Sequence, residues 1–168
     1  MKSLLIIFSA FVSCSIYGQN AKLWRISLET STSIIANSTV SIDIINTDTE
    51  KEDAPIKLNV TQYSGDEEKE ITTEFILQKD KYDEICKNIL NINPNNLLSD
   101  GRIVVDGRTI NLKFMSDTWQ QVEYYTYGFD FDEKTTSSKE FLYVVKSILK
   151  CANVEIYGIN KFKETAKN

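Results

Sequence analysis

Hydrophobic and polar residues alternate in the first half of the chain, and this alternation predicts four strands. In the first of them Trp24, Ile26 and Leu28 alternate with polar neighbours, which is the two-residue period of a strand with one buried face. The four predicted strands cover residues 23–29, 39–45, 55–63 and 71–77. A Ser-Gly-Asp turn separates the last two, so we expect these two strands to form an antiparallel hairpin.

A second group of strands is predicted around Asp106 and Gly107. This Asp-Gly pair lies between two runs of strand-forming residues, and such a setting is a strong hairpin signal. Residues 103–105 and 110–114 would be the arms of the hairpin, and residues 119–127 would add a third arm rich in aromatic side chains. We therefore expect a three-arm meander at the centre of the sheet.

Two segments repeat their apolar residues at helical spacing instead. The first predicted helix covers about residues 80–92, with Asp80 as its N-cap. The second covers about residues 137–152, where Ser137 and Glu140 have the spacing of a capping box. Each helix carries one apolar stripe, which another element must cover.

This order of elements, strands then helix then strands then helix, predicts an α+β fold. We expect a mainly antiparallel sheet of about 6–8 strands, arranged as hairpins and a meander, with the two helices packed on one face. The chain of 168 residues is long enough for one domain. That domain would cover residues 19–168, with residues 161–168 as a polar, frayed tail.

The first 18 residues have the pattern of a secretory signal peptide. Lys2 precedes an apolar run over residues 4–12, which is too short to span a bilayer, and cleavage would follow Gly18. The mature chain would then be exported, to the periplasm or out of the cell. Cys14 offers an alternative, because the residues that end at it resemble a bacterial lipobox. In that case a lipid on Cys14 would anchor the protein.

Cys86 and Cys151 are the two cysteines of the predicted mature chain. An exported compartment permits a disulfide between them, provided that the two helices pack side by side. The alternative is a pair of buried thiols that act as small apolar side chains. The pattern leaves both interpretations open.

Charge and composition exclude several functions. The net charge is −5, which argues against a nucleic-acid partner, because phosphate binding needs clustered Lys and Arg. The sequence has no histidine, so it lacks the usual general base at neutral pH and the commonest transition-metal ligand. It also lacks nucleotide-binding and nucleophile motifs. We therefore expect no enzymatic activity, no cofactor, no metal site and no transmembrane helix in the mature chain.

The aromatic third arm supplies the candidate binding residues, which are Trp119, Tyr124, Tyr125 and Tyr127. Exposed Tyr and Trp side chains are frequent in recognition surfaces, although aromatic residues also pack in sheet cores. The leading hypothesis is an exported, non-enzymatic protein-interaction module of the immunity or inhibitor type, whose acidic loops mask a basic protein partner. One alternative is a small-ligand or glycan-binding module that uses residues 119–127. Another is a hydrolase that works with paired carboxylates.

Overall fold

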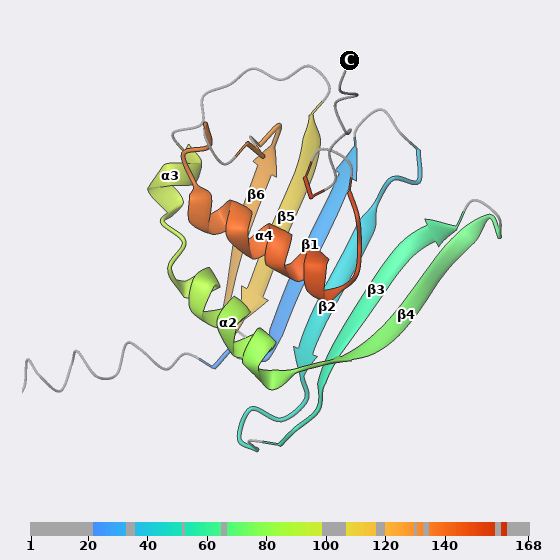
Figure 1. The fold of residues 1–168 in the computed structure, drawn as a ribbon, viewed down its shortest axis with the longest axis vertical. Coiled ribbons are helices and arrows are strands. Elements are labelled where there is room, and N and C mark those ends of the chain that lie inside the picture. Colours follow the sequence, from blue (N-terminus) through green and yellow to red (C-terminus); the bar gives the residue numbers. More distant parts are fainter. Residues whose placement is uncertain are drawn as a thin grey trace, which may run out of the picture.

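The described residues form a six-stranded antiparallel sheet and three helices, of which the two longer ones pack on one face of the sheet (Figure 1). This computed structural model describes residues 22–32, 36–51, 53–64, 67–98, 107–116, 120–129, 131–132, 135–156 and 159–160. The strands are β1 (Arg25–Thr32), β2 (Val40–Asn46), β3 (Ile56–Ser64), β4 (Lys69–Leu77), β5 (Arg108–Met115) and β6 (Gln121–Tyr127). The helices are α2 (Lys79–Leu90), α3 (Pro94–Leu98) and α4 (Lys139–Cys151).

The strands lie in the order β4-β3-β2-β1-β5-β6. Alternation along each strand sends one set of side chains toward the helices. Ile26 of β1, for example, faces Ile44 of β2 and Phe114 of β5 across the sheet, and it is fully buried. Because residues directly opposite each other share a face, this register collects the apolar residues of β1, β2, β3 and β5 into one core.

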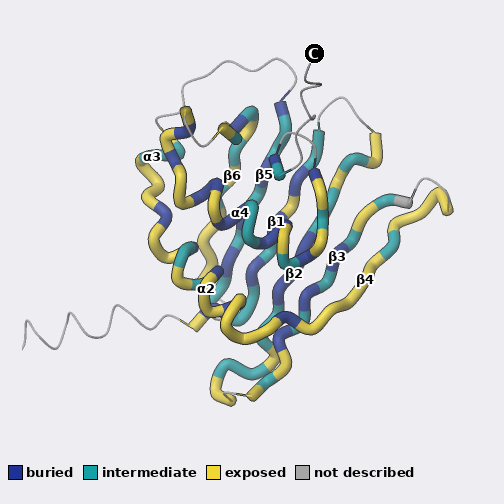
Figure 2. The backbone as a smooth tube through the Cα atoms, in the orientation of Figure 1, coloured by how far each residue is buried: buried dark blue, intermediate teal, exposed yellow. Residues whose placement is uncertain are grey.

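Helices α2 and α4 pack side by side over this core (Figures 1 and 2). α4 buries six residues along one stripe: Phe141, Leu142, Val144, Val145, Ile148 and Leu149. α2 buries Tyr82, Ile85 and Ile89. The Tyr82 hydroxyl donates to the backbone carbonyl of Leu23, and burial raises the pKa of Tyr82 well above its usual range. This hydrogen bond ties α2 to the segment that enters β1.

The predicted α+β class is confirmed, with an antiparallel sheet and helices packed on it. The helices begin and end within two residues of the predicted bounds, but their N-caps differ. Gln78 caps α2, so Asp80 lies inside the first turn. Ser138 caps α4 without a side-chain hydrogen bond, and the Ser137 hydroxyl donates to the carbonyl of Asn96 instead (2.6 Å). The predicted capping box is therefore wrong, because a tertiary contact engages its serine.

The predicted hairpin around Asp106 and Gly107 needs correction. β5 pairs with β1 along one edge and with β6 along the other. Both edges of β5 are thus occupied by other strands, and the predicted arm at residues 103–105 lies outside the described residues. The hairpin partner of β5 is the predicted third arm, β6. β1 fills the other side, and the order of the meander is accordingly different from the predicted one.

Several predictions fall on segments that the structure does not describe. These are the signal peptide at residues 1–18, Cys14 within it, Trp119 and the tail at residues 161–168. Within the described part of the chain, no helix has the length and apolar character needed to cross a membrane.

The two cysteines lie on the packed helices, Cys86 on α2 and Cys151 on α4, and both are free thiols in the structure. Burial raises the pKa of Cys86 to about 11. Burial also raises the pKa of Cys151. Because the thiolate is the nucleophile, both thiols should react slowly.

We expect Cys86 to react with a thiol reagent at pH 8 on the order of 100-fold more slowly than an ordinary cysteine, since its thiolate fraction is smaller by that factor. The measurement is the labelling rate of a Cys14→Ser/Cys151→Ser variant, which keeps Cys86 as its only cysteine. As a control, the same variant in denaturant should label at the ordinary rate.

If Cys86 and Cys151 form no disulfide, the Cys14→Ser chain should show two reactive thiols when it is denatured without reductant. A count of zero would establish the disulfide.

Candidate functional site

The face of the sheet that points away from the helices is polar and partly exposed, and we call it the open face. Its β1 side chains are Arg25, Ser27, Glu29 and Ser31, which alternate with the buried residues of the core. Each of them faces further residues in the neighbouring strands. The row through Glu29, for instance, continues to Ser41 in β2 and to Asn111 in β5.

Most charges on the open face are paired within the protein. The Arg25 guanidinium lies 2.8 Å from an Asp43 carboxylate oxygen, which also accepts a hydrogen bond from the Ser27 hydroxyl. Lys57 of β3 pairs with Glu74 of β4 at 3.2 Å. These pairs are partly exposed and contribute little to stability. They set the positions of these charged side chains at the centre of the open face and on its β4 side.

The predicted aromatic residues separate onto two faces of β6. Tyr124 faces the helices, with its ring centroid 5.8 Å from that of Phe114 and 6.5 Å from that of Phe141. Burial raises the pKa of Tyr124. Tyr125 and Tyr127 lie on the open face, where 64% and 46% of their surfaces are exposed. Tyr124 is therefore a core residue, whereas Tyr125 and Tyr127 form a candidate binding surface.

Two further groups complete this surface next to the tyrosines. Asn111 of β5 lies directly between Glu29 and Tyr125 in the register. Its amide donates to a Glu123 carboxylate oxygen at 2.7 Å, while its own side-chain oxygen has no hydrogen-bond partner among the described residues. We call Glu29, Asn111, Glu123, Tyr125 and Tyr127 the tyrosine patch.

Glu29 is the least constrained charge of the tyrosine patch. It is exposed at the middle of the sheet, and among the described residues no ion pair of its carboxylate is recorded. Glu123, in contrast, contacts Asn111 and lies 3.8 Å from the Lys113 ammonium. The hydroxyl of Tyr127 accepts a hydrogen bond from the backbone N–H of Gly107 (3.1 Å), which fixes its ring on the surface. The patch thus presents two aromatic side chains beside carboxylates.

Glu29 and Asn111 are patch residues that the sequence pattern did not predict. The alternation of apolar and polar residues in β1 and β5 predicts that both side chains face away from the core. Their position in one row with Tyr125 depends on the pairing of β5 with both β1 and β6, which no local pattern encodes.

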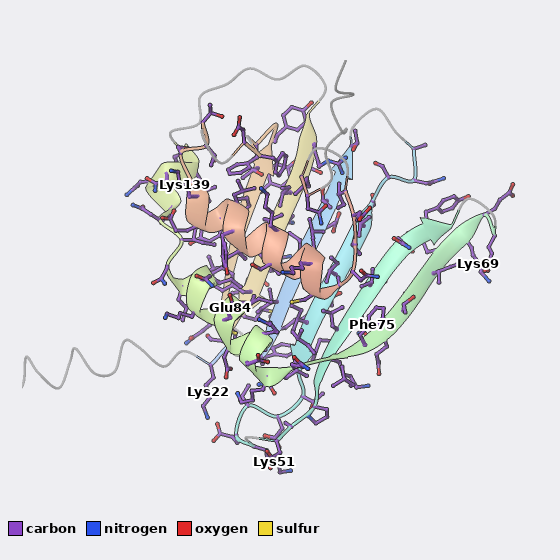
Figure 3. All side chains as sticks on the ribbon, in the orientation of Figure 1. Lys22, Lys51, Lys69, Phe75, Glu84 and Lys139 are labelled. Atoms are coloured by element: carbon purple, nitrogen blue, oxygen red, sulfur yellow. The ribbon has the colours of Figure 1, made fainter. Side chains whose placement is uncertain are left out.

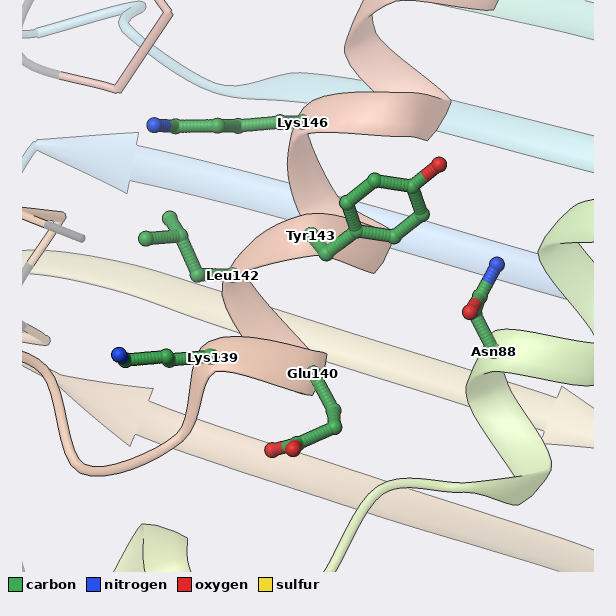
Figure 4. Close-up of a pocket in the computed structure, with 6 residues that line it drawn as sticks. All are labelled: Asn88, Lys139, Glu140, Leu142, Tyr143 and Lys146. Carbon is green, nitrogen blue, oxygen red and sulfur yellow. The ribbon is translucent and has the colours of Figure 1, made fainter.

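Away from the tyrosine patch, two hollows are lined by described residues. One of about 450 Å³ borders α4 and is lined by Asn88, Lys139, Glu140, Leu142, Tyr143 and Lys146 (Figure 4). Its two lysines extend to one side of α4, whereas Tyr143 lies toward α2 (Figure 4). The lysines and Tyr143 therefore do not converge on one ligand.

The second hollow, of about 700 Å³, lies where β4 leads into α2. It is lined by Asp53, Asp80 and Asp83 together with Lys79, and Lys79 already pairs with Asp83 at 3.1 Å. Among the described residues no group of three His, Cys, Asp or Glu side chains could hold a metal ion.

The acidic loops lie at opposite ends of the sheet (Figure 1). The loop between β2 and β3 carries Asp48 and Glu50, and the turn between β3 and β4 carries Glu67 and Glu68. β3 separates them with nine residues, or about 27 Å of extended chain. Each loop also contains or adjoins a lysine that pairs with one of its acids, namely Lys51 with Asp48 and Lys69 with Glu67.

Comparison of the chain with protein-family models, curated proteins and solved structures finds no match. The functional argument therefore rests on the residues and the geometry of this chain.

Proposed function

We propose that this chain is an exported, non-enzymatic binding protein whose tyrosine patch contacts a protein partner through basic side chains of that partner. The observation that carries the proposal is that two exposed tyrosines of β6 share a sheet face with Glu29, which lies two strands away and has no ion pair among the described residues, and that the helices leave this face uncovered.

The chemistry of the patch suits a cationic partner. A Lys or Arg side chain is attracted to the face of a tyrosine ring within about 6 Å of its centroid. Glu29, two strands from Tyr125, can pair with a second basic side chain of the partner. Among the described residues Glu29 has no ion pair, so a partner's charge would not have to displace one there. Tyrosine side chains are also among the commonest anchors of protein interfaces.

The shape of the open face favours a protein over a small molecule. The patch lies on a sheet surface, and none of its residues lines either of the hollows described above. Small ligands generally need a concave site that buries most of their surface, whereas protein interfaces of standard size are broad and comparatively flat. Such a surface suits an immunity or inhibitor role, in which the chain inhibits a basic partner by covering it.

In this proposal the partner contacts the open face of the sheet and not the acidic loops. A single partner that contacted both loops would have to span the length of β3. The open face lies between the loops and offers one continuous surface.

We expect the Tyr125→Ala/Tyr127→Ala variant to lose affinity for its partner by about 30-fold or more, as truncation of central aromatic anchors does. The partner is first captured from envelope extract on the immobilised chain, and the purified pair is then titrated by calorimetry. Tyr143→Ala is the matched control, because it removes another half-exposed tyrosine from the helix side. Affinity that survives in the double variant, or that falls equally in the control, would refute the role of the patch.

A glycan-binding module is the second candidate. Tyr125 and Tyr127 are alternate residues of β6, so their side chains emerge from one face about 7 Å apart, as neighbouring platforms for sugar rings. Titration with soluble oligosaccharides, followed through the tyrosine ring signals in NMR spectra, separates the two functions. Saturable shifts confined to these two residues, without any protein partner, would favour the glycan-binding function.

A further inference from the structure

β4 is an edge strand with a free side. Among the described residues it pairs only with β3. It is nine residues long, and only its last residue, Leu77, is buried. Figure 2 shows it as exposed along almost its whole length. The free edge therefore presents a row of backbone donors and acceptors that can pair with another strand.

This edge lacks three features that often prevent pairing, which are short length, proline and a bulge that twists the strand away. It carries a fourth, charged side chains, at Lys69, Glu70 and Glu74, and these limit the registers in which it can pair. The β3–β4 register runs without interruption from the pair Ile56 and Leu77 to the pair Ser64 and Lys69. The sequence of β4, KEITTEFIL, contains no proline. An edge that is regular and long is suited to interstrand pairing.

Apolar side chains are exposed on both faces of β4. Phe75 lies on the helix side but beyond the part of the sheet that α2 and α4 cover (Figures 1 and 3), and 42% of its surface is exposed. Ile76 lies on the open face, with 65% of its surface exposed. A strand added beside β4 would place neighbours against both side chains.

We propose that the occupant of this edge is a second copy of the chain, paired antiparallel through β4 about a two-fold axis that passes at Thr73. Residues directly opposite each other in an antiparallel pair share a face. A symmetric pair of identical strands must therefore be centred on one residue. In the pair centred on Thr73, Ile71 faces Phe75 on the helix side, and Glu70 faces Ile76 on the open face.

Charge selects this register among the alternatives. With the axis at Thr72, Glu70 of one copy would face Glu74 of the other, and with the axis at Glu74 the two Glu74 carboxylates would face each other. Like charges directly opposite are unfavourable. Axes at Ile71 or Phe75 would pair only five of the nine residues in β4. The Thr73 register pairs all nine and opposes no like charges.

Pairing in this way joins two six-stranded sheets into one continuous sheet of 6 + 6 = 12 strands. The two-fold axis is perpendicular to the sheet, so the two open faces lie on the same side. β6 is the edge strand farthest from β4, and the two tyrosine patches would therefore lie at the outer ends of one extended surface. A partner with two binding sites could then be held by both copies.

The test exploits the fact that only the residue on the axis meets its own copy. Thr73→Lys places two ammonium groups opposite each other, and Thr73→Glu does the same with two carboxylates. In sedimentation equilibrium the unsubstituted chain should have the mass of two chains at micromolar to millimolar concentrations. Each variant alone should dissociate with a Kd raised by about fivefold or more. An equimolar mixture of the two variants should recover the dimer, which also shows that both are folded.

Thr72→Lys is the matched control, since it adds the same charge one residue away. In the proposed register Thr72 faces Glu74 of the other copy, so this variant should dimerise as tightly as the unsubstituted chain or more tightly. The proposal is overturned if the unsubstituted chain is monomeric at about 1 mM, or if Thr72→Lys dissociates the dimer as Thr73→Lys does. It is also overturned if only a charge on the β6 edge, such as Val122→Lys at an exposed position, has that effect.

Discussion

Replacing Phe141 with alanine should lower the free energy of unfolding by about 3–5 kcal/mol. The Phe141 side chain is fully buried, and its ring centroid lies 5.0 Å from that of Phe129 and 6.5 Å from that of Tyr124. It therefore anchors the first turns of α4 to β6 and to the segment that follows β6. Truncation removes the apolar contacts and leaves a cavity between these three elements.

Equilibrium denaturation, monitored by circular dichroism, measures this loss. Phe141→Leu should retain part of the contact and fall between the alanine variant and the unsubstituted chain. Lys150→Ala, an exposed change on the same helix, should stay within about 0.5 kcal/mol. A loss below about 1 kcal/mol in Phe141→Ala would mean that the cavity collapses, and that α4 depends much less on this ring than the ring distances indicate.

The sequence pattern predicted which side chains enter the core because burial in this fold follows strand and helix periodicity closely. Ile26 and Leu28 alternate with polar residues, and both are buried against the helices. The alternation along β6 also predicted which of its side chains share a face. Tyr125 and Tyr127 lie on one face, and Tyr124 lies on the other. Local period decides these features, so no knowledge of the partner strands was needed.

Strand order was not readable, because it depends on contacts between distant segments. β1 lies between β2 and β5, and the Ser31 and Thr109 hydroxyls, 78 residues apart in the chain, are 2.6 Å from each other. The Asp-Gly signal at Asp106 and Gly107 describes only a local turn. The pairing of β5 with β1 overrides it, and this same pairing brings Glu29 to Asn111.

The predicted capping box at Ser137 is wrong for a similar reason. Ser137 has the local spacing of a capping residue, yet its hydroxyl contacts the carbonyl of Asn96 from the segment of α3. In a capping box the serine oxygen would accept a hydrogen bond from a backbone N–H of its own helix, whereas here the Ser137 hydroxyl donates one to a distant carbonyl. Helix positions are thus more predictable than the hydrogen bonds at their ends.

Gly107→Ala should lower the free energy of unfolding by about 1–3 kcal/mol and should disturb Tyr127 on the open face. A Cβ atom at residue 107 would lie 2.9 Å from the backbone nitrogen of Gly128 and 3.0 Å from Cζ of Tyr127. Gly128 itself has a positive φ of 68° and donates its N–H to the carbonyl of Arg108 (3.0 Å), so its backbone has little freedom to move aside. The glycine is required here for a close approach between two backbone segments.

Denaturation of Gly107→Ala in the Tyr127→Ala background separates the two contacts. Removing the ring relieves the clash at Cζ but leaves the one with the Gly128 backbone, so the alanine should still destabilise the protein relative to Tyr127→Ala alone. In the single variant, the NMR signals of the Tyr127 ring should shift, because the N–H of residue 107 donates to its hydroxyl, while those of Tyr143 on α4 should not. Unchanged stability and unchanged Tyr127 signals would show that the strand ends can separate freely, and that the position of Tyr127 does not depend on Gly107.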